Sequence, residues 1–137
     1  MAEHRGTSSL TRSSRLRLAP EILAERRSSG IWEQDLRVPA DLSCWPGHFP
    51  GWQILPGVMQ VDWVMAVALR WLGQRTRLAR MEALKFKQPI LAGQTLTLRL
   101  ESEAAAQRFR FRLADGATVF SLGRLVFERV DVGSESI

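Results

Sequence analysis

The stretch "PGVMQVDWVMAVALRWLG", residues 56–73, decides the fold of this 137-residue chain. Pro56 suits the start of a helix, where its missing N–H group is not needed, and Gly73 suits the end. Ahead of the arginine in its last turn, only Gln60 and Asp62 are polar. A helix that is apolar nearly all round is buried on most of its sides, so we expect this helix to lie in the core. At 1.5 Å per residue it extends ~24 Å, too short to cross a bilayer.

Strand patterns flank the helix on both sides. Before it, "EILAERRSSGIWEQDLRVP" (residues 21–39) has two short runs around the turn signal "SSG", which predicts a hairpin. After it, apolar and polar residues alternate, as one face packs and the other meets water. The four later segments are "LARMEALKFKQPIL" (78–91), "QTLTLRLESE" (94–103), "QRFRFRLA" (107–114) and "ATVFSLGRLVFERV" (117–130). The sequence therefore predicts an α+β domain, with an antiparallel sheet of about six strands wrapped around one long central helix.

Composition restricts the class of protein. The single cysteine, Cys44, excludes an internal disulfide and a cysteine-rich metal site. No apolar run is long enough for a membrane span and no signal peptide is evident, so we expect a cytoplasmic protein. The net charge is +5, and the first eighteen residues hold four arginines against one glutamate, which is +3. No stripe of interleaved aromatic and cationic residues appears, so we expect no nucleic-acid partner.

Three segments are expected along the chain. Residues 1–18 are rich in Ser, Thr and Arg without an apolar period, which predicts a disordered basic tail. Residues 19–132 form the folded domain, and residues 133–137 are a short C-terminal tail. The basic tail is either a solvated extension or an arm that binds anions.

The loop before the helix, "WPGHFPGWQILPG" (residues 45–57), holds three prolines, three glycines and one of the two histidines, His48. Prolines and glycines restrict or specialise the backbone on both sides of His48. Such a loop can hold an imidazole in one orientation, as a general base requires, whereas a lone loop histidine is usually just solvated. Phe49 and Trp52 could cover this site and exclude water.

Asp62 lies beyond the first helical turn, where it neither caps the helix nor gains most from the helix dipole. Its helical neighbours three and four residues away are Val58, Met59, Met65 and Ala66. Asp62 is either a structural carboxylate, satisfied by backbone donors or exposed on a narrow polar strip, or a desolvated acid. Desolvation would raise its pKa and allow proton exchange near neutrality.

The helix start supplies a third element. Gly57 lies where backbone N–H groups have no intrahelical partner, and glycine lets a ligand approach closely. Such an N–H group can donate to a carbonyl oxygen that gains negative charge. A donor, a candidate base and a candidate acid in one segment indicate proton transfer beside an acyl carbonyl.

These residues also carry a family resemblance. "GHFPGWQILPGVMQVD" (residues 47–62) resembles the signature of hotdog-fold 3-hydroxyacyl-ACP dehydratases, the FabA-like and FabZ-like group. In that pattern, GHFPG-x-P-[IV]-[LMV]-PGV is followed by an acid fourteen residues after the histidine, which is the spacing of His48 and Asp62. "LKFKQPILAGQTLTL" (84–98) resembles the family strand that bears F-x-x-P-[IV]-x-x-G-D-x-L. The likeness extends from about residue 20 to about residue 130 and is closest to the ApeI-like dehydratases of aryl polyene clusters.

The resemblance implies a hotdog fold and a catalytic site shared by two subunits. His48 would remove the α-proton of a (3R)-3-hydroxyacyl thioester, and Gly57 N–H would polarise the thioester carbonyl. Asp62 of the partner subunit would protonate the departing hydroxyl, which gives a trans-2-enoyl thioester. The remaining expected substrate contacts are Phe49, Pro50, Trp52, Pro56 and Val58.

The resemblance also implies the partners. The acyl chain would be carried by an acidic acyl carrier protein or by CoA, in fatty acid, aryl polyene or related lipid or polyketide synthesis. We expect a homodimer or an oligomer of dimers, with no metal and no cofactor. Four arginines near the helix end could meet the carrier or simply suit a helix C-terminus: Arg70, Arg75, Arg77 and Arg80. The alternatives are a hotdog acyl thioesterase and a non-catalytic acyl-binding subunit.

Three positions depart from the family pattern. Asp62 stands where the FabZ-like branch has Glu, although the FabA-like branch has Asp there. Gln53 replaces the usual proline, which is the reason to consider a non-catalytic role. Gln94 replaces the aspartate that follows the glycine of the second motif, a change in a turn with little catalytic weight.

Overall fold

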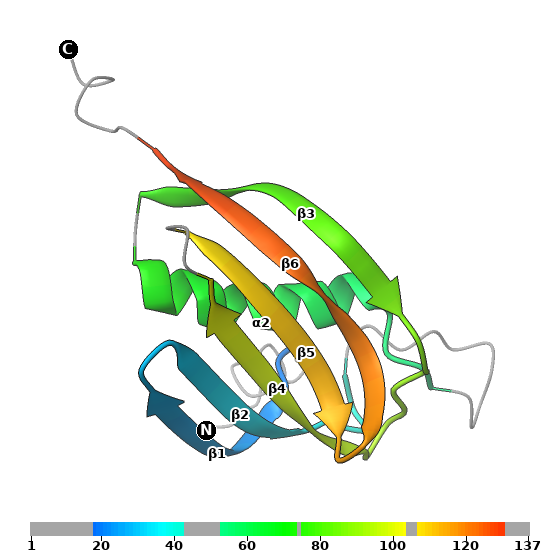
Figure 1. The fold of residues 1–137 in the computed structure, drawn as a ribbon. Helices are drawn as coiled ribbons and strands as arrows, with labels where there is room; N and C mark the ends of the chain where they lie inside the picture. The colour runs from blue at the N-terminus through cyan, green and yellow to red at the C-terminus, as the bar shows by residue number, and fades with distance from the viewer. Residues whose placement is uncertain (1–17, 43–52, 74, 104–106, 131–137) are drawn as a thin grey trace, which may run out of the picture.

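A computed structural model describes residues 18–42, 53–73, 75–103 and 107–130. Within these ranges, six strands form one antiparallel sheet in the order β1-β2-β4-β5-β6-β3, and one helix lies across a face of that sheet (Figure 1). The elements are β1 (Glu21–Ser28), β2 (Ile31–Arg37), α2 (Gly57–Leu72), β3 (Thr76–Phe86), β4 (Thr95–Ser102), β5 (Arg108–Asp115) and β6 (Thr118–Arg129). The predicted α+β class, hairpin, helix and four later strands are all confirmed.

Turn chemistry explains where the first hairpin reverses. β1 and β2 pair from Ser28 and Ile31 at the turn to Glu21 and Arg37 at the open end. Gly30 takes a φ of +78° between them, a left-handed conformation that glycine adopts without steric cost. The "SSG" signal therefore marks the reversal.

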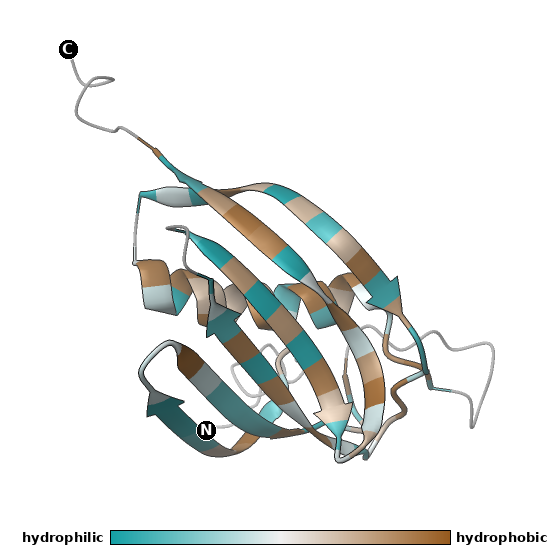
Figure 2. Cartoon of the chain, in the orientation of Figure 1, coloured by the Kyte–Doolittle hydropathy of each residue, from teal (hydrophilic) through white to brown (hydrophobic). Residues whose placement is uncertain are grey.

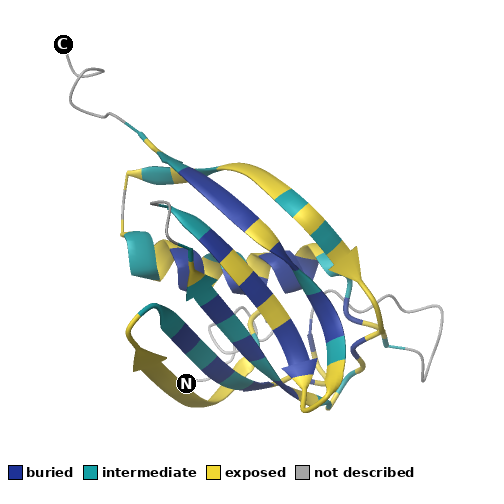
Figure 3. Cartoon of the chain, in the orientation of Figure 1, coloured by how far each residue is buried: buried dark blue, intermediate teal, exposed yellow. Residues whose placement is uncertain are grey.

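The alternating strands build one core. Trp32, Leu36, Leu98, Phe111 and Leu113 point into it and are each at most 3% exposed. Hydrophobic and hydrophilic positions alternate along β4 and β5 in Figure 2, and burial alternates in the same way in Figure 3. Sheet alternation thus places every second side chain against the helix.

Burial differs from one side of the helix to another. Its sheet-facing residues are buried, including Trp63 and Val64, but a stripe at a spacing of four residues is exposed. The stripe consists of Val58, Asp62, Ala66 and Arg70. Val58 is 68% exposed in the single chain. The helix is therefore buried on most of its sides, as expected, and nothing in the described chain covers this one stripe.

Strands β1 and β3 form the two edges of the sheet. β3 pairs with β6 and leaves its other side open, and Met81 on β3 is 45% exposed. Within the described ranges, no helix combines the length and the apolar character that a bilayer span requires.

Candidate active site

The first turn of α2 leaves backbone donors without helical acceptors. Pro56 precedes the helix with φ −62° and ψ 148°, and no side chain caps this end. The carbonyl oxygen of Pro56 accepts from the N–H groups of Met59 (3.1 Å) and Gln60 (3.2 Å). The N–H groups of Gly57 and Val58 come before these donors, so the helix offers them no partner. Within the described residues, the expected donor is therefore unpaired where the sequence places it.

An aromatic ring covers the other side of Gly57. A Cβ atom built on Gly57 would lie 2.7 Å from Cζ of Phe86, a distance that real Cβ atoms do not show. Phe86 ends β3 and is 50% exposed. The sequence predicts that a ligand can approach Gly57 because this residue has no side chain. In the structure, the same lack of a side chain makes room for the Phe86 ring.

A shallow pocket of about 460 Å³ opens at this end of the helix. Its lining comes from the helix start and from the chain after β3: Ile54, Leu55, Pro56, Gly57, Gln60, Phe86, Lys87, Gln88 and Pro89. The two segments are tied together, because Leu55 N–H donates to the Ile90 carbonyl (2.7 Å) and Ala92 N–H donates to the Gln53 carbonyl (3.1 Å). The backbone that leads to Gly57 is thus held by a neighbouring chain segment.

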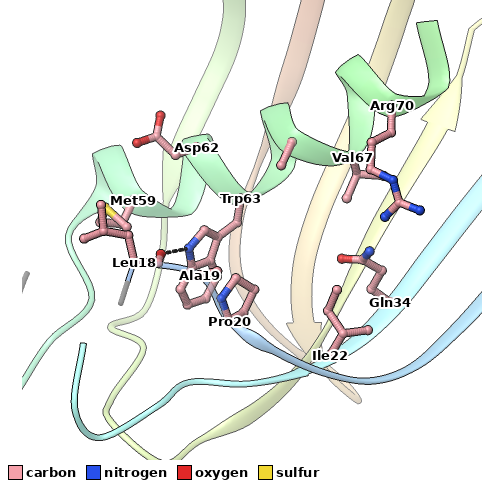
Figure 4. Close-up of a pocket in the computed structure, with 11 residues that line it drawn as sticks. Leu18, Ala19, Pro20, Ile22, Gln34, Met59, Asp62, Trp63, Val67 and Arg70 are labelled. Atoms are coloured by element: carbon pink, nitrogen blue, oxygen red, sulfur yellow. Dashed lines mark hydrogen bonds between the residues drawn. The ribbon is translucent and has the colours of Figure 1, made fainter. Parts of the chain in front are cut away.

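Asp62 lies near the middle of the exposed stripe and borders a second pocket. Its carboxylate is exposed and points away from Trp63 and Gln34 (Figure 4). The described part of the chain therefore leaves Asp62 open to solvent.

The second pocket, of about 540 Å³, lies between α2 and the segment that leads into β1 (Figure 4). Its walls are mainly apolar: Leu18, Ala19, Pro20, Ile22, Met59, Trp63, Ala66 and Val67, with Gln34, Asp62 and Arg70 as the polar members. The indole N–H of Trp63 donates to the Leu18 carbonyl (2.8 Å), which fixes one wall to the helix. An apolar pocket with a few polar groups is typical of a site that binds a small molecule.

Polar groups lie together toward the Arg70 end of this pocket. The Glu25 carboxylate accepts hydrogen bonds from the side chains of Gln34 (2.7 Å) and Trp32 (2.7 Å). Arg70 approaches the same oxygen at 3.5 Å. The hydrogen bonds from Gln34 and Trp32 lower the pKa of Glu25, and the nearby Arg70 charge adds to this. Glu25 is therefore held as a carboxylate by its neighbours.

Several expected site residues lie outside the described residues: His48, Phe49, Pro50 and Trp52. The structure thus brings together Pro56, Gly57 and Val58 at the helix start and places Asp62 further along the same helix.

Two of the departures from the family pattern have structural roles in the backbone. The Gln94 side-chain oxygen accepts from Leu91 N–H (2.9 Å), a turn contact of the kind an aspartate makes. Gln53 contributes its carbonyl to the pairing with Ala92.

The four arginines are not one group at the helix end. Arg70 is in the last helical turn, whereas Arg77 and Arg80 lie on β3 and pair with Glu128 and Glu82. Exposed ion pairs of this kind contribute little stability, so they remain available to other anions.

Sequence reasoning missed two residues at the helix start. Gln60 is 4% exposed and donates a side-chain hydrogen bond to the Leu55 carbonyl (3.2 Å). Its signal was visible, since it is one of only two polar residues in the apolar part of the helix. Phe86 belongs to the F-x-x-P motif, but only the three-dimensional fold shows that it contacts Gly57. Among the described residues, no group of three His, Cys, Asp or Glu side chains could hold a metal ion.

Comparison with known proteins supports the family resemblance that the motifs indicate. A family model described as ApeI-like, ApeI dehydratase, matches residues 24–124. The chain is 30% identical over 99 residues to the 3-hydroxyacyl-[acyl-carrier-protein] dehydratase FabZ of Herpetosiphon aurantiacus. That match covers 62% of this chain and 67% of the relative.

Two solved structures share the fold. A chain of the dehydratase heterocomplex ApeI:P from Xenorhabdus doucetiae superposes with a TM-score of 0.72 at 28% identity, covering 80% of this chain and 98% of that chain. An uncharacterized protein from Erwinia carotovora subsp. atroseptica gives a TM-score of 0.67 at 35% identity, covering 81% and 97% of the two chains. The hotdog architecture is thus shown by the order of the strands and by these neighbours.

Proposed function

Because the chain belongs to the ApeI-like dehydratase family, we propose that it removes water from (3R)-3-hydroxyacyl thioesters and forms trans-2-enoyl thioesters. The observation that carries the proposal is the position of Asp62. This carboxylate lies on the exposed stripe of α2, beside an apolar pocket and little more than one helical turn from Gly57. An acid, an apolar pocket and a free N–H donor are what elimination beside a thioester carbonyl requires.

Each step has a proposed residue. His48 removes the proton from C2 of the acyl chain, while Gly57 N–H stabilises the negative charge that develops on the thioester oxygen. The C3–O bond then breaks, and Asp62 of the partner subunit donates the proton with which the hydroxyl leaves as water. The electron pair of the C2–H bond becomes the new C2–C3 double bond. The reaction needs no cofactor and no change of oxidation state overall.

The assembly follows from the surfaces that the single chain leaves open. The exposed stripe includes Val58 and Ala66, two apolar side chains on a helix face that nothing in the described chain covers. The open edge of β3 lies at one side of the sheet. A second copy that pairs along this edge would cover the stripe and desolvate Asp62. We therefore propose a homodimer with two shared sites.

The carrier of the acyl group is part of the proposal. The FabZ relative acts, by its name, on acyl groups held by an acyl carrier protein. An acidic carrier protein fits the net charge of +5, and Arg70 near the apolar pocket is a candidate contact. CoA thioesters are the alternative delivery form, and fatty acid, aryl polyene and related lipid or polyketide pathways are the proposed settings.

One assay distinguishes the candidate functions. The protein is mixed with 3-hydroxyacyl thioesters of increasing chain length, on CoA and on carrier protein. Absorbance of the conjugated enoyl thioester and release of free thiol are followed in parallel. We expect the enoyl absorbance to rise without thiol release. Thiol release alone would indicate the thioesterase, and neither signal with any substrate would indicate a non-catalytic subunit.

A further inference from the structure

The side chain of Gln60 is buried in an arrangement that satisfies only half of its amide. It is 4% exposed, and its Nε2 donates to the Leu55 carbonyl at 3.2 Å. Its Oε1 is buried without a hydrogen-bond partner among the described residues. The orientation is set by chemistry, because only the NH₂ group of the amide can donate to a carbonyl.

A half-satisfied buried amide is unfavourable for stability. An acceptor that loses water and gains no partner destabilises the folded state. A leucine or methionine would remove this acceptor, but it would leave the Leu55 carbonyl without its side-chain donor. Gln60 therefore needs a reason beyond packing. The one hydrogen bond that it makes points to that reason.

The acceptor, Leu55, lies two residues before Gly57. Its N–H donates to the Ile90 carbonyl (2.7 Å), and its carbonyl accepts from the Gln60 side chain. Pro56, which follows, has a fixed φ of −62°. The N–H and the carbonyl of Leu55 are thus both held by hydrogen bonds. Because Pro56 has a fixed φ, the orientation of Leu55 also limits the orientation of Gly57.

We propose that Gln60 is a positioning residue, which fixes the direction of the Gly57 N–H group by holding the Leu55 carbonyl. The inference rests on the proposed function, in which that N–H group binds the thioester oxygen. Gln60 makes two hydrogen bonds to the residues just before the helix. Its backbone N–H donates to the Pro56 carbonyl (3.2 Å) and its side chain donates to the carbonyl one residue earlier. No contact between Gln60 and the substrate is needed.

Two variants separate positioning from packing. Gln60→Leu keeps the volume and removes the orphan oxygen, but it also leaves the Leu55 carbonyl without its side-chain donor. One unpaired acceptor is exchanged for another, so the thermal midpoint should change little. The kcat of this variant should fall about tenfold with little change in KM, since the lost interaction acts on charge in the transition state. Gln60→Glu can donate to the Leu55 carbonyl only when its carboxyl is protonated. The ratio of its kcat to that of the wild type should therefore rise as pH falls, while the ratio for Gln60→Leu stays flat.

Ser121→Ala is the matched control. Ser121 is 0% exposed and its Oγ also lacks a partner among the described residues, so the change removes another buried orphan oxygen. It should leave kcat unchanged. A second readout is the amide resonance of Gly57 in a ¹H–¹⁵N spectrum, which should shift in Gln60→Leu and not in Ser121→Ala.

The two readouts fail separately. An unchanged kcat in Gln60→Leu, or a Gly57 resonance that does not move, overturns the positioning role. An inactive wild type with a shifted Gly57 resonance overturns the proposed function and leaves the structural part of the inference supported.

Discussion

The ring of Phe86 lies against the backbone of Gly57, so close that a Cβ on residue 57 would be 2.7 Å from Cζ of the ring. The two residues come from different elements, the end of β3 and the first turn of α2. Their contact joins the two motifs that carry the family resemblance at the proposed oxygen-binding donor. A substitution at either residue should therefore shift the position of the other.

Gly57→Ala should reduce dehydration by about tenfold or more, because the new methyl displaces the Phe86 ring and shifts the donor by a fraction of an ångström. The fold should persist, since alanine is favourable in a helix and the half-exposed ring can move. Steady-state kinetics and a thermal melt check both statements. Adding Phe86→Leu to Gly57→Ala should restore part of the rate. A double variant no better than the single one would show that the collision is not the cause.

Asp62→Asn should lower dehydration by about two to four orders of magnitude, as the loss of an acid–base group usually does. The exposed position of Asp62 in the single chain means that the fold should be unaffected. Asp115→Asn, at the end of β5, is the control and should keep full activity. If Asp62→Asn turns over at the normal rate, Asp62 has no part in the mechanism.

Mixing two inactive variants tests whether the site is shared between subunits. His48→Ala and Asp62→Asn homodimers should both be inactive. After subunit exchange, half of the dimers are mixed and each has one intact site of two, so activity should return to about a quarter of the wild-type level. Absence of any recovery, with exchange verified by mass spectrometry, would place both residues of a site in one chain.

Ala66→Glu should disrupt the dimer without unfolding the protomer. Ala66 is exposed on the stripe of α2, and glutamate is a good helix former, so the isolated chain tolerates the change. At a dimer interface the same carboxylate would be buried without a partner. Sedimentation should show a monomer with little activity. Ala117→Glu, in the turn between β5 and β6, should stay dimeric, and a dimeric, active Ala66→Glu would argue against the stripe as the interface.

Glu25 should make stability depend on pH in the acid range. Hydrogen bonds from Gln34 and Trp32 lower its folded-state pKa from the ordinary value of 4.5. Its contribution is fully present above that value and is lost as pH falls through the lower folded pKa. Glu25→Gln should reduce the free energy of unfolding at pH 7 by about 1 kcal/mol. Urea unfolding at pH 7, 5, 4 and 3 should show this difference shrinking below about pH 4.5; a constant difference would contradict it.

The sequence predicts the elements well because their periods are local. Proline at residue 56 and glycine at residue 73 mark the helix ends, and the alternation around Leu98 and Phe111 marks buried strand faces. The exposed stripe could not be predicted in this way. Val58 and Ala66 are as apolar as core residues, yet both are exposed. Composition alone therefore does not distinguish the helix face that packs on the sheet from the face that is open in the single chain.

The candidate site was predictable only where residues are close in sequence. Gly57 and Asp62 share one helix, so their spacing could be anticipated. The contact of Phe86 with Gly57 depends on how β3 returns past the helix start, which no local pattern encodes. The role of Gln60 depends on the direction of one amide, which only the fold around Leu55 reveals.

Trp63 on the helix donates a hydrogen bond to the Leu18 carbonyl. This bond holds the segment before β1 in place as one wall of the apolar pocket. The short run from Leu18 to Pro20 precedes the first strand and takes no part in the sheet ladder. Substitutions there can widen or narrow the pocket without disturbing the core between the sheet and the helix. If the proposed function holds, the length of acyl chain that fits this pocket is therefore set by a few entry residues that lie apart from the proposed catalytic residues on the helix.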